Sequence, residues 1–218
     1  MTAPRFASRK VVITAGPTHE AIDAYHFIST RDTGQLGYKL AEAAIRSGAQ
    51  TVLVSGPVDL PLPPGVQVMP VNTALEMLST CERELPCDIA ILAAMVANWR
   101  VVNERTAGLE LSLVQNPDIA KMIGTRRDAR PMIVVGCTTE RANPVENGRK
   151  TLREAGCDLI LAEDASPEAE SLISDRVTIH LVSRDKVETW SRLGRKEIAR
   201  RLTEVMATRL AAPLHEGD

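Results

Sequence analysis

The chain has 218 residues, of which 44% are hydrophobic and 25% are charged, and its net charge is -2. This is ordinary globular composition, and neither the charge nor the 3% aromatic content favours a surface for nucleic acids. The apolar runs are too short for a transmembrane helix, and the first residues enter a strand-like run without a signal peptide. We therefore expect a cytoplasmic protein that contacts neither nucleic acid nor membrane.

The first half of the chain alternates expected strands with expected helices. Short apolar runs at residues 10–14, 51–54, 66–71 and 88–94 predict buried strands. A long polar loop should follow the first strand, and a helix is expected from about Tyr38 to Arg46. Thr73 and Glu76 have the spacing of a capping box, which predicts a helix from there toward Glu84.

The second half continues the same alternation. Residues 109–114 alternate like a strand that could be antiparallel, and Asn116 followed by Pro117 predicts the cap and first position of a short helix. Strands are expected at 132–136, 158–162 and 176–182, with helices at 143–156 and 195–210 and a frayed tail after 211. The pattern predicts one α/β domain over residues 1–218, of the Rossmann-like doubly wound class, with a mainly parallel sheet and helices on both faces.

Ligands of such sheets bind beyond the carboxyl ends of the strands, so the loops there are the candidate site. Gly16 and Gly56 end the first two strands, and Gly34 and Gly37 lie where the first helix should begin. The free amides and the dipole of a helix N-terminus favour an anion, which predicts phosphate binding at residues 34–37, close to Gly16 and Ser55. The alternative is that both helix glycines only permit the turn and the packing of helix on sheet.

The remaining polar residues give weaker signals. Glu20 and His26 fit solvated loop positions, whereas Asn98 and Trp99 directly follow a buried strand, where a Trp could also cap the core. The four cysteines form no CxxC pair and have no histidine cluster beside them. We therefore expect no metal site built from these residues.

Six motifs in order give a more specific indication than any single loop. They are VVITAGPTHEAID (11–23), HFISTRDTGQLGYKLAEAA (26–44), VLVSGPVDLPLPPGV (52–66), DIAILAAMVANWR (88–100), NPDIA (116–120) and CDLILAED (157–164). In these motifs the chain resembles phosphopantothenoylcysteine synthetase, the ligase half of the bifunctional coenzyme A enzyme of bacteria. The resemblance implies a dimeric Rossmann-like ligase that activates the carboxylate of 4'-phosphopantothenate with CTP or ATP and Mg²⁺. The amine of cysteine then attacks the acyl-nucleotide.

The resemblance also assigns site residues. The catalytic positions are His26, Thr30 and Asn98. The nucleotide or phosphate positions are Gly16, Thr18, Gly34, Gly37, Ser55, Gly56, Ala93, Ala94, Asn116, Asp118, Cys137 and Glu140.

Several of these positions depart from the family pattern. His26 and Thr30 stand where the family has Arg and Asn, and Asn98 stands where it has Asp. Cys137 replaces a nucleotide-facing Phe, Thr151 and Ala155 replace two lysines, and the lysine-rich lid expected between Arg100 and Leu109 is missing. Loss of single electrostatic donors costs about 10²–10³ in rate each, so we expect weak or absent canonical ligation.

Three functions remain open from the sequence. The first is a paralogue that acts on another small anionic acid, in the biosynthesis of a cofactor or a sulfur metabolite. The second is a working phosphopantothenate–cysteine ligase with compensating residues, and the third is a non-catalytic ligand-binding or partner subunit of a flavoprotein decarboxylase. The resemblance further implies a homodimer.

Overall fold

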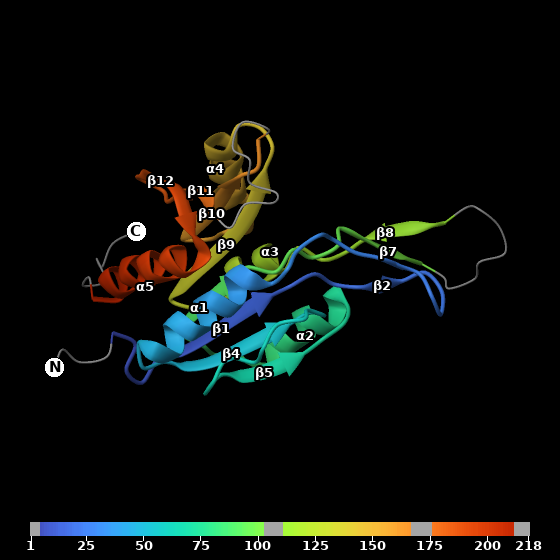
Figure 1. Ribbon diagram of the computed structural model, residues 1–218, viewed down its shortest axis with the longest axis horizontal. Helices are drawn as coiled ribbons and strands as arrows, with labels where there is room; N and C mark the ends of the chain where they lie inside the picture. Colours follow the sequence, from blue (N-terminus) through green and yellow to red (C-terminus); the bar gives the residue numbers. More distant parts are fainter. Residues whose placement is uncertain (1–4, 103–110, 167–175, 212–218) are drawn as a thin grey trace.

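The computed structural model describes residues 5–102, 111–166 and 176–211, and its centre is a mainly parallel sheet (Figure 1). Within these residues the sheet has eight strands in the order β12-β11-β10-β9-β6-β1-β4-β5. Six strands run parallel, and β11 and β12 are antiparallel additions at one edge. Their bounds are β1 Lys10–Ala15, β4 Gln50–Ser55, β5 Gln67–Pro70, β6 Ile89–Leu92, β9 Ile133–Glu140, β10 Leu159–Asp164, β11 Arg176–Val182 and β12 Val187–Gly194.

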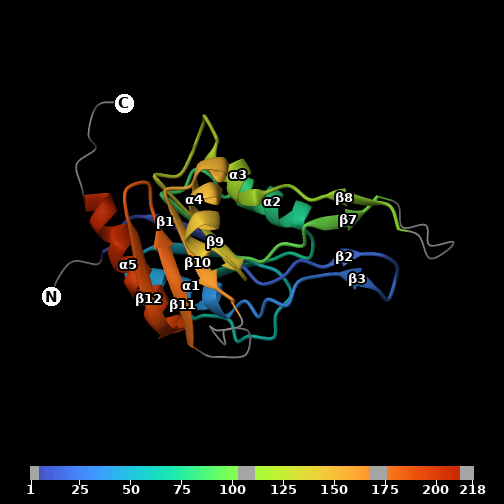
Figure 2. The same cartoon turned by 90° about the horizontal axis from the view of Figure 1, so that it is seen from above.

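Helices cover both faces of the sheet, as Figure 2 shows. Helices α1 (Gln35–Arg46) and α5 (Arg195–Ala211) pack on one face, and α2 (Ala74–Arg83), α3 (Ile119–Gly124) and α4 (Pro144–Ala155) pack on the other. Successive strand residues point to opposite faces, so Val11 and Ile13 join the core under α1 and α5 while Val12 joins the other core. The predicted Rossmann-like α/β fold class is confirmed.

The order of the strands reverses at the centre of the sheet, beside β1. From β1 the chain builds outward through β4 to β5, then returns to β6 on the other side of β1 and builds outward again. The carboxyl ends of β1, β6 and β9 therefore meet at the point where the strand order reverses. This is where open parallel sheets bind ligands.

Local boundaries differ from the sequence prediction where side chains or distant strands decide them. Helix α1 begins at Gln35 rather than Tyr38, because Gly34 adopts a left-handed conformation (φ 73°) that ends the preceding loop. The cap of α3 is Asp118 and not Asn116, since the Asp118 side chain accepts the Lys121 amide. The capping box of Thr73 and Glu76 is present as predicted.

Two short hairpins extend from the carboxyl edge of the sheet and form an arm beside it (Figures 1 and 2). The first, β2 (Glu20–Ala21) with β3 (Phe27–Ile28), lies in the segment that the sequence predicted to be a polar loop. The second pairs β7 (Trp99–Val101), which the sequence did not predict, antiparallel with β8 (Leu113–Gln115). Residues 109 and 110 of the strand predicted at 109–114 lie outside the described residues. The sequence also missed β12, an edge strand with a mixed apolar and polar pattern.

The predicted frayed tail after 211 lies outside the described residues, as does most of the segment expected to carry the lysine-rich lid. None of the helices that the structure describes combines the length and apolar character that a membrane crossing needs.

Candidate functional site

The loop after β6, residues 93–98, is held by side chains from the loops around it. The amides of Ala94 and Ala97 donate to the hydroxyls of Thr14 (3.1 Å) and Thr18 (3.0 Å). The Met95 amide donates to the Gly16 carbonyl at 3.2 Å, and the Thr30 hydroxyl donates to the Met95 carbonyl at 2.6 Å. Because both ends of this loop are hydrogen-bonded to neighbouring segments, the loop forms a fixed wall of the site. We call residues 93–98 the wall loop.

Asn116 and Asp118 support the same wall from the other side. The Asn116 side-chain amide donates to the Ala97 carbonyl at 2.8 Å, and its oxygen accepts from Arg100 at 3.1 Å. Asp118 caps α3 by accepting from the Lys121 amide at 3.0 Å. Both side chains therefore position the edge of the site while lining it.

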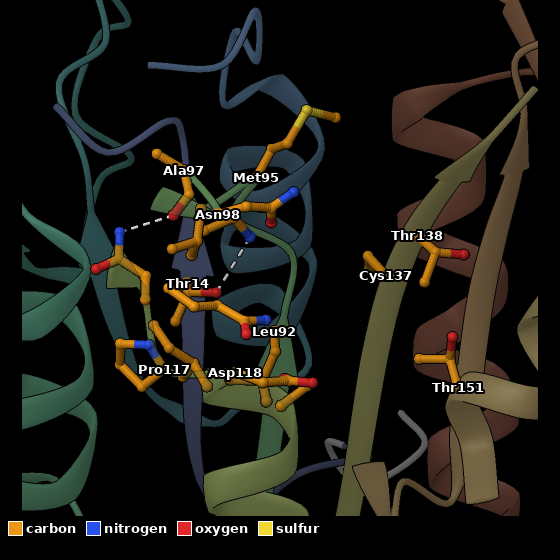
Figure 3. A pocket seen from close by; sticks show the side chains of 16 residues that line it. Thr14, Leu92, Met95, Ala97, Asn98, Pro117, Asp118, Cys137, Thr138 and Thr151 are labelled. Atoms are coloured by element: carbon orange, nitrogen blue, oxygen red, sulfur yellow. Dashed lines mark hydrogen bonds between the residues drawn. The ribbon is translucent and has the colours of Figure 1, made fainter. Parts of the chain in front are cut away.

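A pocket with a cavity volume of about 340 Å³ lies between this wall on one side and strand β9 and helix α4 on the other (Figure 3). We call it the large pocket, to distinguish it from a smaller pocket that adjoins it. Asp118 is the one charged residue of its described lining, which is otherwise made of threonine, amide and small apolar side chains. The Thr138 hydroxyl, which belongs to this lining, is buried without a hydrogen-bond partner among the described residues. The lining residues are Thr14, Leu92, Ala94, Met95, Val96, Ala97, Asn98, Gln115, Asn116, Pro117, Asp118, Ile119, Ala120, Cys137, Thr138 and Thr151.

The small pocket, of about 190 Å³, adjoins the large one on the side of α1 and α5. Ala94, Met95, Cys137 and Thr138 line both pockets, so the ends of β6 and β9 separate them. The charged residues of the small pocket are Arg31, Asp32, Glu163 and Arg195, and its apolar lining includes Leu36, Leu161 and Ile179.

Cys137 lies between the two pockets and carries no charge. Burial raises the pKa of its thiol well above the usual range, and Cys157, Glu163 and Asp32 raise it further. The side chain is therefore a small neutral group at the place where the resemblance expects a Phe.

The structure brings together only part of the predicted site. Ala94, Asn98, Asn116, Asp118 and Cys137 line the large pocket, and Ala93, Ala94 and Cys137 line the small one. Thr30 and Thr18 reach the wall loop through the hydrogen bonds described above. Glu140 instead accepts from Asn147 at 2.8 Å near the start of α4 and lines neither pocket.

His26 lies away from both pockets, in the hairpin of β2 and β3. Its ring contacts the carboxylate of Asp23 at 2.9 Å, and hydrogen bonds from the Tyr25 amide and His26 lower the pKa of Asp23. His26 is largely exposed. His26 lines neither the large pocket nor the small one.

The predicted phosphate glycines lie in a tightly packed junction. A Cβ at Gly34 would lie 2.8 Å from the Val58 side chain, and Cβ atoms at Gly37 and Gly56 would collide with Ala15 and Pro17. Gly16 and Gly34 also have positive φ, so all four glycines have a packing or backbone reason to be there. Ser55 is buried and contacts the Tyr38 hydroxyl at 3.2 Å. Anion binding at this junction stays a prediction.

Sequence reasoning missed the charged residues of the small pocket. Arg31 and Asp32 were part of a polar loop, and Glu163 and Arg195 come from an expected strand and helix far along the chain. Thr138 could have been predicted from the sequence, because it directly follows Cys137, which the resemblance assigned to the site. Both residues belong to strand β9. No local pattern indicates that Arg195 approaches Asp32.

The fit of a nucleotide with Mg²⁺ is incomplete in the described residues. The large pocket has the size for a polar ligand of nucleoside dimensions, but its described lining offers no cation for a triphosphate. Among the described residues no three His, Cys, Asp or Glu side chains are grouped to hold a metal. The coordination of Mg²⁺ would therefore come mostly from phosphate oxygens of the nucleotide.

The sequence matches the family described as DNA/pantothenate metabolism flavoprotein C-terminal domain over residues 6–210. The coenzyme A biosynthesis bifunctional protein CoaBC of Escherichia coli (strain K12) is 38% identical over 186 residues, which cover 80% of this chain and 46% of that protein. CoaBC of Bacillus subtilis (strain 168) is 34% identical over 196 residues, which cover 84% of this chain and 47% of that protein. The chain thus spans about half the length of these relatives.

Solved structures agree with this match. A crystal structure of the C-terminal domain of CoaBC superposes with a TM-score of 0.82 at 29% identity, covering 95% of this chain and 98% of that one. A mutant of Cab2 in complex with phosphopantothenate-cysteine has the same fold, with a TM-score of 0.68 at 13% identity over 92% of this chain and 87% of that one. With a family match over nearly its whole length, the chain belongs to the DNA/pantothenate metabolism flavoprotein C-terminal domain family, and the resemblance to phosphopantothenoylcysteine synthetase is confirmed.

Proposed function

We propose that the chain is a divergent phosphopantothenate–cysteine ligase-like enzyme that joins a small anionic acid to an amine in the biosynthesis of a cofactor or a sulfur metabolite. The relatives are named for coenzyme A biosynthesis, which supports the ligase class. The acid would occupy the large pocket, where Asn98, Asn116 and the unpaired Thr138 hydroxyl offer hydrogen bonds. Its activated carboxyl group would lie near the wall loop and Thr30.

The observation that carries the proposed divergence is the lining of the large pocket. Cys137 and Thr151 leave it without the aromatic face and the lysine charge that the resemblance implies for a nucleotide site. The Thr30 hydroxyl is bonded to the Met95 carbonyl, so it is less available to a reacting carbonyl than an amide would be. A triphosphate in this pocket would face Asp118 with no lining cation to offset it.

The activator would be a nucleotide, CTP or ATP with Mg²⁺, because an acid does not condense with an amine without activation. The group would supply a good leaving group on the carboxyl carbon when bound. The backbone of the wall loop would hold it. The phosphate glycines Gly16, Gly34, Gly37 and Gly56 remain candidates through the N-terminus of α1.

The working coenzyme A ligase is the second candidate, and it is favoured by the 38% identity to CoaBC. The remaining partners are also proposals. The family description names a flavoprotein, which fits a decarboxylase partner, and the resemblance implies a homodimer.

Purified protein should be assayed for CTP- and ATP-dependent condensation of 4'-phosphopantothenate with cysteine, alongside the combined variant Thr30→Asn, Asn98→Asp and Thr151→Lys. We expect at most about 10⁻² of the rate of an authentic ligase from the natural chain, since each lost donor costs roughly 10²–10³. We expect a measurable gain from the restored residues. The assay should follow both pyrophosphate release and amide formation.

A thermal-shift screen with CTP, ATP and phosphopantothenate measures binding separately from turnover and serves as the control for the assay. A ligand at 100 times its dissociation constant should stabilise the native state by about 2.7 kcal/mol. A fast CTP-dependent reaction by the natural chain would contradict the divergence and support the working ligase. Binding without turnover in every combination would support the non-catalytic subunit.

A further inference from the structure

We propose that a third pocket, at the junction of β12 and α5, binds a small molecule that carries several phosphate groups. We call it the basic pocket. It has a cavity volume of about 780 Å³, and its lining includes Arg46, Arg176, Gly194, Lys196, Glu197 and Arg200. The inference goes beyond the proposed ligase function and does not depend on it, because none of these residues lines the large pocket or the small one.

The basic pocket concentrates positive charge in a chain whose net charge is -2. Its described lining has four cationic side chains and one carboxylate. The cations come from three elements, because Arg46 ends α1, Arg176 begins β11, and Lys196 and Arg200 belong to α5. Helices α1 and α5 lie side by side on one face of the sheet (Figure 1). An anion in the pocket would therefore meet donors from several sides.

The carboxylate of the lining does not neutralise these cations. Glu197 accepts hydrogen bonds from Arg200 at 2.7 Å and from Arg201 at 3.0 Å, and these bonds lower the pKa of Glu197 to about 2. Arg46 approaches Glu42 only to 3.5 Å, and an exposed ion pair of this kind holds an arginine weakly. The pocket therefore keeps a net positive charge.

Lys196 is the residue that points most directly to a ligand. It lies in the first turn of α5, where the helix dipole is positive and disfavours a cation, and four residues before Arg200, where like charges repel. The ion pair with Glu163 at 3.2 Å explains the neighbouring Arg195. Lys196 itself forms no ion pair or hydrogen bond within the described part of the chain. An anion in the basic pocket would offset both unfavourable interactions.

Several phosphate groups fit this lining better than other anions do. Guanidinium groups bind phosphate oxygens through paired hydrogen bonds, and the first amides of α5 have no partner within the helix. The cavity is large enough for a molecule of nucleotide size, whereas a single carboxylate group would engage only part of the charge. Nucleic acid is disfavoured, because the described lining holds no aromatic side chain on which a base could stack.

The test is calorimetric titration of the full chain with tripolyphosphate at physiological ionic strength, together with NMR spectra of the isotopically labelled protein. We expect tripolyphosphate to bind and to shift the amide signals of Gly194 and Lys196. Inorganic phosphate and sulfate should bind at least about 10-fold more weakly, because each contacts fewer of the cations. Lys196→Gln should weaken tripolyphosphate binding by roughly 10-fold, and Lys196→Gln combined with Arg46→Gln by roughly 50-fold.

Thermal stability separates a binding role of Lys196 from a structural one. Lys196→Gln removes a charge that the helix dipole disfavours, so its melting temperature should equal or exceed that of the natural chain while phosphate binding falls. Arg127→Gln is the matched control, because it removes one charge from an exposed arginine beyond α3, which packs on the opposite face of the sheet. It should leave tripolyphosphate binding within about 2-fold of the natural chain.

Four results would overturn the proposal. No binding of tripolyphosphate, or binding that survives the double variant, would remove the basic pocket as a site. Equal weakening by Arg127→Gln would reduce the effect to the net charge of the chain. NMR shifts confined to Gly16, Gly34 and Gly37 would place the anion at the junction of the phosphate glycines. A single-stranded oligonucleotide that binds more tightly than tripolyphosphate, with an affinity that increases with its length, would replace the small molecule with nucleic acid.

Discussion

Three buried thiols show how the core controls the ionisation of single residues. Burial raises the pKa of Cys81, Cys87 and Cys157 to about 12 in each case, from an ordinary value of 9.0. Cys81 is a buried residue of α2 and belongs to the same core cluster as Met77. These thiols are therefore protonated at physiological pH, as expected for small hydrophobic residues rather than for nucleophiles.

We predict that the free energy of unfolding falls as pH rises above 9. The unfolded chain loses its thiol protons from about pH 9, whereas the folded chain keeps them until about pH 12, so alkali favours the unfolded state. Each thiol contributes a slope of up to about 1.4 kcal/mol per pH unit in that window. Urea denaturation of Cys81→Ala from pH 7 to 10.5 should show a shallower fall than the natural chain. Thr80→Ala, a neighbouring variant without a titrating group, should lower stability at every pH with an unchanged slope.

At the scale of elements, Arg130 joins the ends of two helices to the sheet. Its guanidinium donates to the carbonyl of Gly124, the last residue of α3, at 2.7 Å. It also donates to the carbonyl of Gly156, the C-cap of α4, at 2.8 Å and pairs with Asp158 at 3.0 Å. A fixed positive charge at two helix C-termini satisfies carbonyls that have no partner in the helices.

We predict that Arg130→Ala lowers the free energy of unfolding by about 2–4 kcal/mol, because several charged hydrogen bonds and an ion pair are lost together. Arg130→Lys should recover less than half of that loss, since an ammonium group cannot reach both carbonyls with the geometry of a planar guanidinium. Chemical denaturation measures both changes. Arg127→Ala, which alters an exposed arginine three residues away, should stay within about 0.5 kcal/mol of the natural chain. An Arg130→Lys variant as stable as the natural chain would show that the fork geometry is unimportant.

At the scale of the whole molecule, the arm of two hairpins exposes large apolar side chains. Tyr25 is 88% exposed, Phe27 51%, Trp99 48% and Leu113 44%. Glu20 anchors the first hairpin by accepting the Ala74 amide of α2 at 2.8 Å, so the arm has a fixed root. Apolar groups gathered on one projecting element are typical of a protein–protein contact.

We predict a homodimer that uses this arm. Light scattering at micromolar concentration should give twice the chain mass, and the double variant Phe27→Asp with Trp99→Asp should give a monomer because it places charge in the contact. Met132→Asp changes a similarly exposed residue outside the hairpins and should leave the dimer intact. A monomeric natural chain, or a dimer in all three proteins, would contradict the assignment of the arm.

The order of strands and helices was predictable because each rests on a local pattern. The apolar runs of β1 and β6, the capping box of Thr73 and Glu76 and the Pro144 start of α4 all lie within a few residues of the element they define. The loops at the carboxyl ends of the strands were predictable for the same reason. The strands that the sequence missed are β2, β3, β7 and β12, whose pairing partners, not their own sequences, make them strands.

The composition of the two pockets was decided by the tertiary structure alone. Thr151 lines the same pocket as Asn116 because α4 and α3 pack on the same face of the sheet. Asp32 shares a cavity with Glu163 and Arg195 because the loop before α1, the end of β10 and the start of α5 meet there. Asp32 is more than a hundred residues from Glu163 and Arg195 in the sequence, and no periodicity within a segment encodes its distant neighbours. The sequence by itself therefore determined the fold, the family and the edge of the sheet that carries the site. Which charges meet there, and which of them are left unpaired, followed from the packing of distant elements.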